Sequence, residues 1–411
     1  MRFWLVIFFI LRGACLSAQN TAEVSISGIV IEKTTGNPMP YANVMIKNNF
    51  MATVTNDNGE FKLTIPGLLE SDSLKISFMG YKTATVAISG LSKNNTIFLE
   101  ERSETLNEVQ VKGQTAISIV KTAIGKIPLN YYTRPYKSKG FYRVTSMTGE
   151  KYVHLSEAVF ELHNAKRASQ FKLIKMRAVK DEKASLGLDA GLSPETIISI
   201  DLIPSQHLFL NDEGLKDYDF EFENTSSYMD HEVYIISFDH KKRVKSYGYK
   251  GKMFIDTDTH AIVYIAYGFS PNGFQFYHYG SITQRALMDV FNIHIDMLAC
   301  NYEISYKKIG ARYYLNTVYE DAVLTLRGNK RKGTSEIVAH ADYIVNDVDF
   351  ANTKPFSDNE ILKGNSLVER QESSYDETFW DGYNIILPNM NFASIAKSIE
   401  TSNKANSFEK R

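Results

Sequence analysis

The chain has 411 residues, which is enough for two or three domains and more than one ordinary core holds. The formal net charge is −1, so no strong overall charge draws the chain to nucleic acid, and we expect no nucleic-acid partner. The 24 Tyr and 24 Phe favour a fold that is mainly β, because aromatic side chains pack well on pleated surfaces.

The first 18 residues have the order of a secretory signal peptide. Arg2 supplies the positive start, residues 3–11 are apolar, and small residues lead to an expected cleavage after Ala18. The apolar run is too short for a membrane-spanning helix, which needs about 20 residues. A lipoprotein signal is the alternative, and it would make Cys15 the acylated residue. We expect an exported chain, in the periplasm or at the outer membrane of a Gram-negative bacterium, with no transmembrane segment in its mature form.

The second cysteine, Cys300, is alone once the leader is removed, so no intramolecular disulfide is expected. It lies in the apolar segment 293–300, which predicts a small buried residue rather than a reactive thiol.

Residues 22–101 predict a small β-sandwich of seven strands. Short alternating segments are separated by turn signals every 8–12 residues. The clearest turn is Asn56-Asp57-Asn58-Gly59, because Asn and Asp bond their own backbone and Gly accepts a positive φ. A calcium loop at Asp57 would need a longer run of oxygen ligands, so the turn is preferred.

Three segments of this unit resemble the carboxypeptidase-regulatory-like domain. They are residues 28–44 (GIVIEKTTGNPMPYANV), 53–61 (TVTNDNGEF) and 74–81 (LKISFMGY). The resemblance implies a transthyretin-like sandwich of the kind found in Bacteroidota-type envelope proteins. It also implies a scaffold or adaptor without catalysis of its own. The residues that follow are similar to an uncharacterised β-rich envelope domain.

The remainder predicts a linker and a larger sheet domain. Residues 102–135 hold a short strand at 106–111 and an amphipathic helix over 114–127, which we expect to stop at Pro128. Residues 136–390 alternate in long sequential hairpins, which favours one curved antiparallel sheet that wraps over the helix. Residues 379–388 are expected to dock as a strap, and residues 391–411 form a polar tail.

One group of residues has the composition of a zinc site. His154 and Glu157 have the spacing of zinc carboxypeptidase ligands, and His278 follows later in the chain. On a strand, however, residues three apart point to opposite faces. We expect a surface Glu and a paired His, and no metal or cofactor.

Two further groups are explained by turns. Asp256, Asp258 and His260 are expected to form a hairpin turn. The basic runs 241–245 and 330–332 lie in expected hairpin loops. One interpretation is a solvated turn, and the other is contact with an acidic glycan or lipid head group.

The strongest candidate for a ligand or partner surface is an aromatic group around the turn 271–273. Aromatic faces can stack on sugars or anchor a partner. The same residues alternate as in an ordinary strand, which is the competing interpretation. The group comprises Phe269, Phe274, Phe276, Tyr277 and Tyr279.

Three hypotheses follow for the function. The first is a non-catalytic envelope protein that binds or scaffolds a protein partner. The second is a carbohydrate- or lipid-binding module that uses the curved sheet, favoured if the sheet encloses an apolar cavity. The third is an accessory to, or a cryptic form of, a zinc carboxypeptidase.

Overall fold

The structure is a computed structural model that describes residues 23–408, except residues 48, 70, 92–93, 103–114, 133, 166–168, 182–198, 207, 230, 329–333, 363–375 and 389–391. The expected signal peptide with Cys15, the expected strand at 106–111 and the second basic run lie outside the described residues. No helix among the described residues is long and apolar enough to cross a membrane.

The N-terminal unit is a seven-stranded sandwich, as predicted. One sheet has the order β4-β1-β7 and the other β3-β2-β5-β6. The predicted turn forms, since the side chain of Asn56 accepts hydrogen bonds from the backbone of Asn58 and Glu60, and Gly59 has a φ of +74°. The strands are β1 Glu23–Glu32, β2 Asn43–Ile46, β3 Ala52–Val54, β4 Glu60–Pro66, β5 Ser73–Ser77, β6 Ala84–Ala87 and β7 Asn95–Leu99, with 3-10 turns η1 Gly67–Leu69 and η2 Ile88–Gly90.

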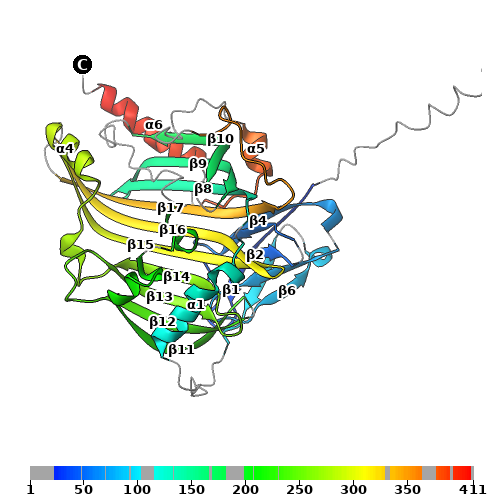
Figure 1. Cartoon of the computed structure of the whole chain (residues 1–411). Helices are drawn as coiled ribbons and strands as arrows, with labels where there is room; N and C mark the ends of the chain where they lie inside the picture. Colours follow the sequence, from blue (N-terminus) through cyan, green and yellow to red (C-terminus); the bar gives the residue numbers. More distant parts are fainter. Residues whose placement is uncertain are drawn as a thin grey trace, which may run out of the picture.

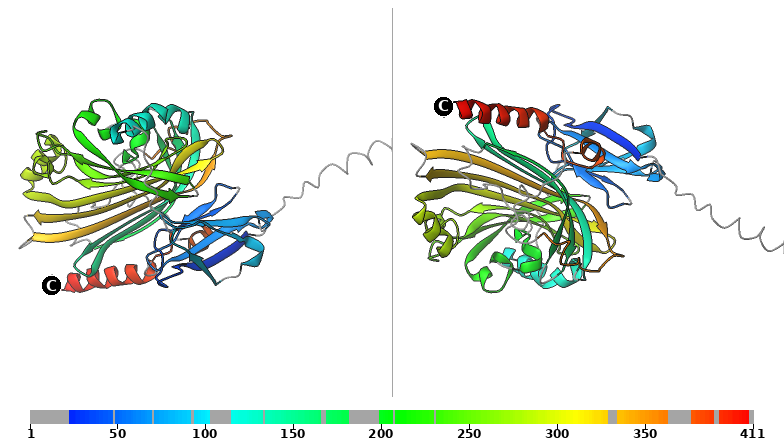
Figure 2. Two further views of the ribbon diagram at one scale, coloured as in Figure 1. Left: turned by 90° about the horizontal axis from the view of Figure 1, so that it is seen from below. Right: turned by 90° about the horizontal axis from the view of Figure 1, so that it is seen from above.

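The second unit is one ten-stranded antiparallel sheet with the order β10-β9-β8-β17-β16-β15-β14-β13-β12-β11. It is strongly curved, as predicted (Figures 1 and 2). Register shifts interrupt several of its ladders, and such bulges increase the local twist. The strands are β8 Tyr136–Thr148, β9 Lys151–Asn164, β10 Gln170–Lys180, β11 Tyr218–Tyr228, β12 His231–His240, β13 Tyr249–Asp256, β14 Ile262–Phe269, β15 Ile293–Ile309, β16 Arg312–Gly328 and β17 Thr334–Asp349.

The inner face of this sheet is covered over one half by helix α1, Ala116–Asn130. The helix continues through Pro128 rather than stopping there, because a proline in the last turn removes only one helical hydrogen bond. Tyr131, which follows the helix, is buried, and its hydroxyl donates to the carbonyl of Ile262. Helix α3, Leu202–Ser205, and the 3-10 turns η3, Leu208–Leu210, and η4, Gly214–Lys216, complete this core.

The outer face of the sheet carries the sandwich and a strap. Helix α5, Glu377–Gly382, and the residues after it lie between the two units, where Trp380 is buried. The side chain of Asn384 accepts a hydrogen bond from the backbone N–H of Thr64 at 2.6 Å and donates one to the carbonyl of Thr64 at 3.0 Å. Arg143 donates to the carbonyl of Ile386 at 2.7 Å. The sandwich is therefore fixed against the sheet by the strap.

The end of the chain differs from the expected polar tail. Residues Phe392–Phe408 form helix α6, which packs along β9 and β10. Ile395 and Ile399 are buried against Leu155. Spacing of four residues puts both isoleucines on one helix face, and the many polar residues around them concealed this face.

Candidate functional site

The aromatic group gathers at one end of the curved sheet, but not as a strand. Phe274–Phe276 form the 3-10 turn η5, so the expected strand alternation is wrong here. The backbone turns because Gly273 and Phe274 both donate to the carbonyl of Ser270. A Cβ at Gly273 would come within 2.6 Å of the carbonyl oxygen of Ser246, so only glycine fits this close approach.

Three of the five predicted residues are in ring contact. Phe269 ends β14, with its ring centroid 5.3 Å from that of Phe274 and 4.4 Å from that of Tyr277. Tyr249, which sequence reasoning missed, stacks on Phe269 at 5.4 Å. Tyr247 meets Tyr277 at 5.6 Å. The cluster therefore joins the ends of β13 and β14 to the turn that follows.

The other two predicted residues lie nearby. Tyr279 is partly exposed and lines, together with Tyr277, a small cavity of about 430 Å³. Phe276 is half-buried within η5. His278 is exposed in the same loop.

Beside the cluster, the inner face of the sheet carries a buried acid that the sequence analysis missed. Glu320 in β16 is 3% exposed, and its Oε1 accepts a hydrogen bond from the Cys300 thiol at 3.3 Å. Its Oε2 has no hydrogen-bond partner among the described residues. Burial raises the pKa of Glu320 to about 7. Cys300 is buried, as predicted, and burial likewise raises the pKa of its thiol.

Glu320 is the polar member of an otherwise apolar strand face. Alternation places Val318, Ala322, Leu324 and Leu326 on the same face of β16 as Glu320. A lone acid in such a period-two apolar pattern is the signal that could have found it.

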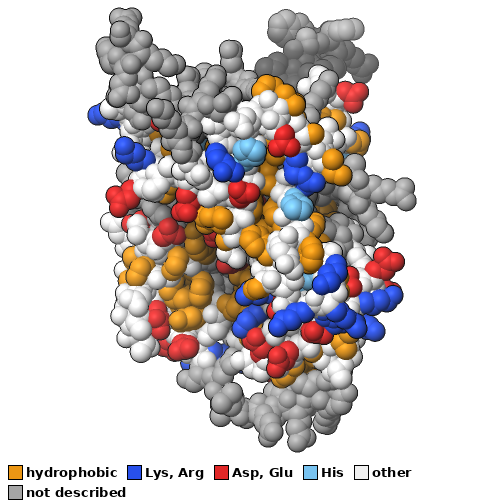
Figure 3. Space-filling view, turned by 90° about the vertical axis from the view of Figure 1, so that its left-hand side faces the viewer, with side chains coloured by type: hydrophobic (Ala, Val, Ile, Leu, Met, Phe, Trp, Pro, Cys, Tyr) orange, Lys and Arg blue, Asp and Glu red, His pale blue; other side chains and the backbone are white. Residues whose placement is uncertain are grey.

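The inner face stays apolar beyond the half that α1 covers. Cys300, Ala322 and Ala339 are paired directly across β15, β16 and β17, and their small side chains form one apolar cluster on this face. Seen from this end, the molecule shows a hollow with hydrophobic side chains inside it (Figure 3). Large apolar residues complete this end of the face: Ile293, Ile295, Met297, Leu324, Leu326 and Ile337.

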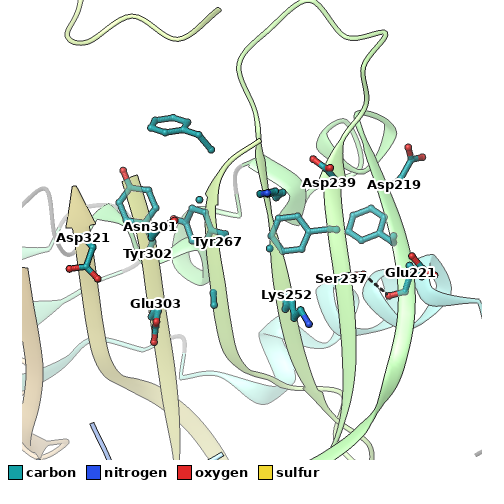
Figure 4. Close-up of a pocket in the computed structure, with 17 residues that line it drawn as sticks. Asp219, Glu221, Ser237, Asp239, Lys252, Tyr267, Asn301, Tyr302, Glu303 and Asp321 are labelled. Atoms are coloured by element: carbon teal, nitrogen blue, oxygen red, sulfur yellow. Dashed lines mark hydrogen bonds between the residues drawn. The ribbon is translucent and has the colours of Figure 1, made fainter. Parts of the chain in front are cut away.

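A second depression lies on the outer face. It measures about 960 Å³, and in Figure 4 helix α1 lies behind the sheet that forms its floor. Two of its acids already have partners: Asp321 pairs with His340, and Glu303 accepts from Tyr264. Tyr267, which also contributes to the floor, is only 6% exposed. The ring of Tyr267 is therefore not open for a sugar to stack on it.

Of the candidate zinc ligands, Glu157 forms ion pairs with two arginines. Glu157 is fully buried rather than exposed, which corrects the expectation of a surface residue. Its two oxygens meet Arg143 Nη2 at 2.6 Å and Arg177 Nε at 2.5 Å. A buried carboxylate is stable when charged partners surround it in this way. His154 lies on the opposite face of β9, as expected.

The predicted hairpin turn after β13 is present. Asp256 Oδ1 accepts from the backbone of Asp258 and Thr259 at 3.1 and 2.7 Å, and His260 has a φ of +59°. His231 Nδ1 lies 3.0 Å from the other oxygen of Asp256. No group of three or more His, Cys, Asp or Glu that could hold a metal ion occurs among the described residues.

The chain was compared with known proteins. Residues 26–111 match the family model of the CarboxypepD_reg-like domain. Over 109 residues, 26% of this chain, the sequence is 30% identical to the TonB-dependent receptor SusC of Bacteroides thetaiotaomicron. That match spans only 10% of the receptor.

Solved structures give weaker similarities. A LolA superfamily protein from Nitrosomonas europaea is 11% identical with a TM-score of 0.21, and the match covers 61% of this chain and 99% of that one. A DUF1329 family protein from Desulfovibrio piger is 10% identical with a TM-score of 0.25, covering 59% and 95%. Scores this low carry no argument about function. The family match is specific to the sandwich, and residues 26–111 of this chain are a CarboxypepD_reg-like domain, as their motifs predicted.

Proposed function

We propose that this chain is a non-catalytic protein of the bacterial cell envelope that binds an apolar ligand, such as the acyl chains of a lipid, on the inner face of its ten-stranded sheet. The observation that carries the proposal is the apolar inner face beyond α1, which ends in the hydrophobic hollow of Figure 3. Ligand pockets are typically apolar with a few polar groups that fix orientation. Glu320 and the neighbouring tyrosines supply such groups here.

Two observations support the envelope location. The first 18 residues have the order of a secretory signal. The CarboxypepD_reg-like domain is similar in sequence to part of a TonB-dependent receptor. In this chain the domain acts as a scaffold, because the strap and the outer face of the sheet hold it in place.

An apolar ligand is preferred over a sugar. The clustered rings of Phe269, Tyr249 and Tyr277 continue into aliphatic side chains rather than into a polar groove. The depression on the outer face, in turn, is lined by many charged residues, and Phe238 and Tyr267 are buried in its floor.

The test uses two neighbouring positions of β17 that point to opposite faces. Ala339 is 2% exposed on the inner face, whereas Val338 is 42% exposed on the outer face. We expect Ala339→Trp to fill the site and to weaken binding of the fluorescent apolar probe N-phenyl-1-naphthylamine roughly tenfold or more. Val338→Trp, the matched control, should bind the probe like the wild type. Circular dichroism and the melting temperature of each variant check the fold, and Ala339→Leu is the milder variant if the Trp variant does not fold.

Equal probe binding by folded Ala339→Trp and wild type would remove the proposal. Extraction of the purified protein, followed by mass spectrometry, identifies any retained lipid. Metal analysis of the same sample tests the peptidase hypothesis, since stoichiometric zinc would revive it. A dominant crosslinked protein partner, with neither probe nor lipid bound, would favour the adaptor hypothesis instead.

A further inference from the structure

Helix α4, Ile282–Val290, is oriented opposite to an ordinary surface helix. Such a helix normally buries its apolar side, yet no residue of α4 is buried. Ile282, Leu287 and Val290 are 78%, 58% and 78% exposed, and Phe291 just after the helix is 59% exposed. These four residues form what we call the α4 apolar face.

The opposite side of α4 faces the protein. Arg285 and Met288 are half-buried there, and they line the cavity of about 430 Å³ together with Tyr279. The helix is well defined, because Ser281 and Gln284 form a reciprocal capping box at its start. Because α4 is a stable helix whose other side contacts β15, its apolar face points away from the protein.

The α4 apolar face lies at the open end of the curved sheet. Its helix begins directly after the aromatic turn and leads into β15, whose first residues belong to the apolar inner face. In Figure 1, α4 lies at the left, and Figure 3 views that side of the molecule, where the hollow opens. The exposed helix thus lies at the end of the molecule where the hollow opens.

A basic loop lies at the same end. The hairpin between β12 and β13 carries Lys242, Arg243 and Lys245, all exposed. It touches the aromatic turn through the ring contact of Tyr247 with Tyr277. Lys241 pairs with Asp219 at 3.7 Å, so the other three basic residues supply the positive charge of the loop.

We infer that the α4 apolar face and the basic loop together bind the surface of an anionic lipid bilayer. Exposed apolar side chains enter the boundary between head groups and acyl chains, while nearby basic residues attract acidic head groups. A protein partner or a second copy would explain the apolar face, but neither calls for the basic loop beside it. The inference deepens the proposed function, because it places the membrane at the mouth of the apolar hollow.

The experiment is flotation with vesicles of phosphatidylethanolamine and phosphatidylglycerol, using the chain that begins at Gln19, so that apolar residues 3–11 do not contribute. We expect the wild type to float with these vesicles at low salt. The double variant Leu287→Ser/Phe291→Ser should partition roughly tenfold or more weakly. The matched control is Phe98→Ser/Leu129→Ser, two side chains 53% and 67% exposed elsewhere, which should float like the wild type.

The triple variant Lys242→Ser/Arg243→Ser/Lys245→Ser should lose the preference for phosphatidylglycerol and the sensitivity to salt. Equal flotation of the α4 variant and the wild type, or no flotation of the wild type, would overturn the inference. So would a wild-type dimer in sedimentation velocity that the α4 variant abolishes, because the partner would then be a second copy. The α4 variant should still bind N-phenyl-1-naphthylamine, so a failure here is distinguishable from a failure of the proposed function.

Discussion

The buried acid Glu320 makes the stability of the fold depend on pH. In the folded chain its carboxyl lies among apolar and aromatic groups, and among the described residues it accepts one hydrogen bond, from the weak thiol donor of Cys300. Burial disfavours the charged form and raises the pKa of the carboxyl from the ordinary 4.5 to about 7. The folded state therefore holds a proton that the unfolded chain has released at neutral pH.

The sign and the size of the effect follow from proton linkage. Between pH 4.5 and pH 7 the folded state binds more protons at this group than the unfolded state, so the free energy of unfolding falls as the pH rises through that window. The two pKa values differ by about 2.5, which corresponds to about 3 kcal/mol of lost stability above pH 7. Glu320→Gln removes the titrating group and keeps the shape of the side chain. We expect the variant to be more stable than the wild type by up to about 3 kcal/mol at pH 8, and similar to it at pH 4.5.

The assay is urea unfolding followed by circular dichroism at both pH values. Glu336→Gln is the control, because Glu336 is exposed on β17 and this variant should match the stability of the wild type at both pH values. The reasoning fails if Glu320→Gln destabilises the fold equally at both pH values, because the charged carboxylate would then be a favourable part of the core.

Two further substitutions test how the large sheet and the sandwich are held together. Glu157→Gln leaves Arg143 and Arg177 buried without their shared carboxylate, so we expect a loss of roughly 3–5 kcal/mol in the free energy of unfolding by urea; an unchanged midpoint would contradict this. Asn384→Ala removes both hydrogen bonds to the Thr64 backbone. We expect the free energy of unfolding to fall by roughly 1–3 kcal/mol and the strap to be cleaved faster by protease. Unchanged protease resistance would count against the role of the strap.

Local sequence signals predicted the parts of the fold that depend on neighbouring residues. The turn at Asn56 and Gly59 was predicted because both residues act on their own backbone. Helix α1 was predicted from apolar spacing, and only its end at Pro128 was wrong. The hairpin turn at Asp256 was predicted for the same local reason.

The remaining features depend on contacts that spacing does not encode. Burial of Glu157 needed Arg143 from β8 and Arg177 from β10, two strands that flank β9 only in the folded sheet. The aromatic alternation from Phe274 predicted a strand, whereas close backbone approach at Gly273 made a 3-10 turn. Such contacts join residues far apart in the chain, so a single sequence carries little trace of them.

Strand β16 shows how one alternating sequence assigns different roles to the two faces of the sheet. Tyr319 points outward and packs on Tyr41 of the sandwich, with ring centroids 4.9 Å apart. Glu320 and Ala322 point inward, toward the apolar site. A slip of one residue would exchange the two sets of side chains. The docked sandwich covers apolar residues of the outer face, such as Phe141, so that face is committed to the scaffold. The inner face beyond α1 is then the apolar surface of the sheet on which we propose that a ligand binds.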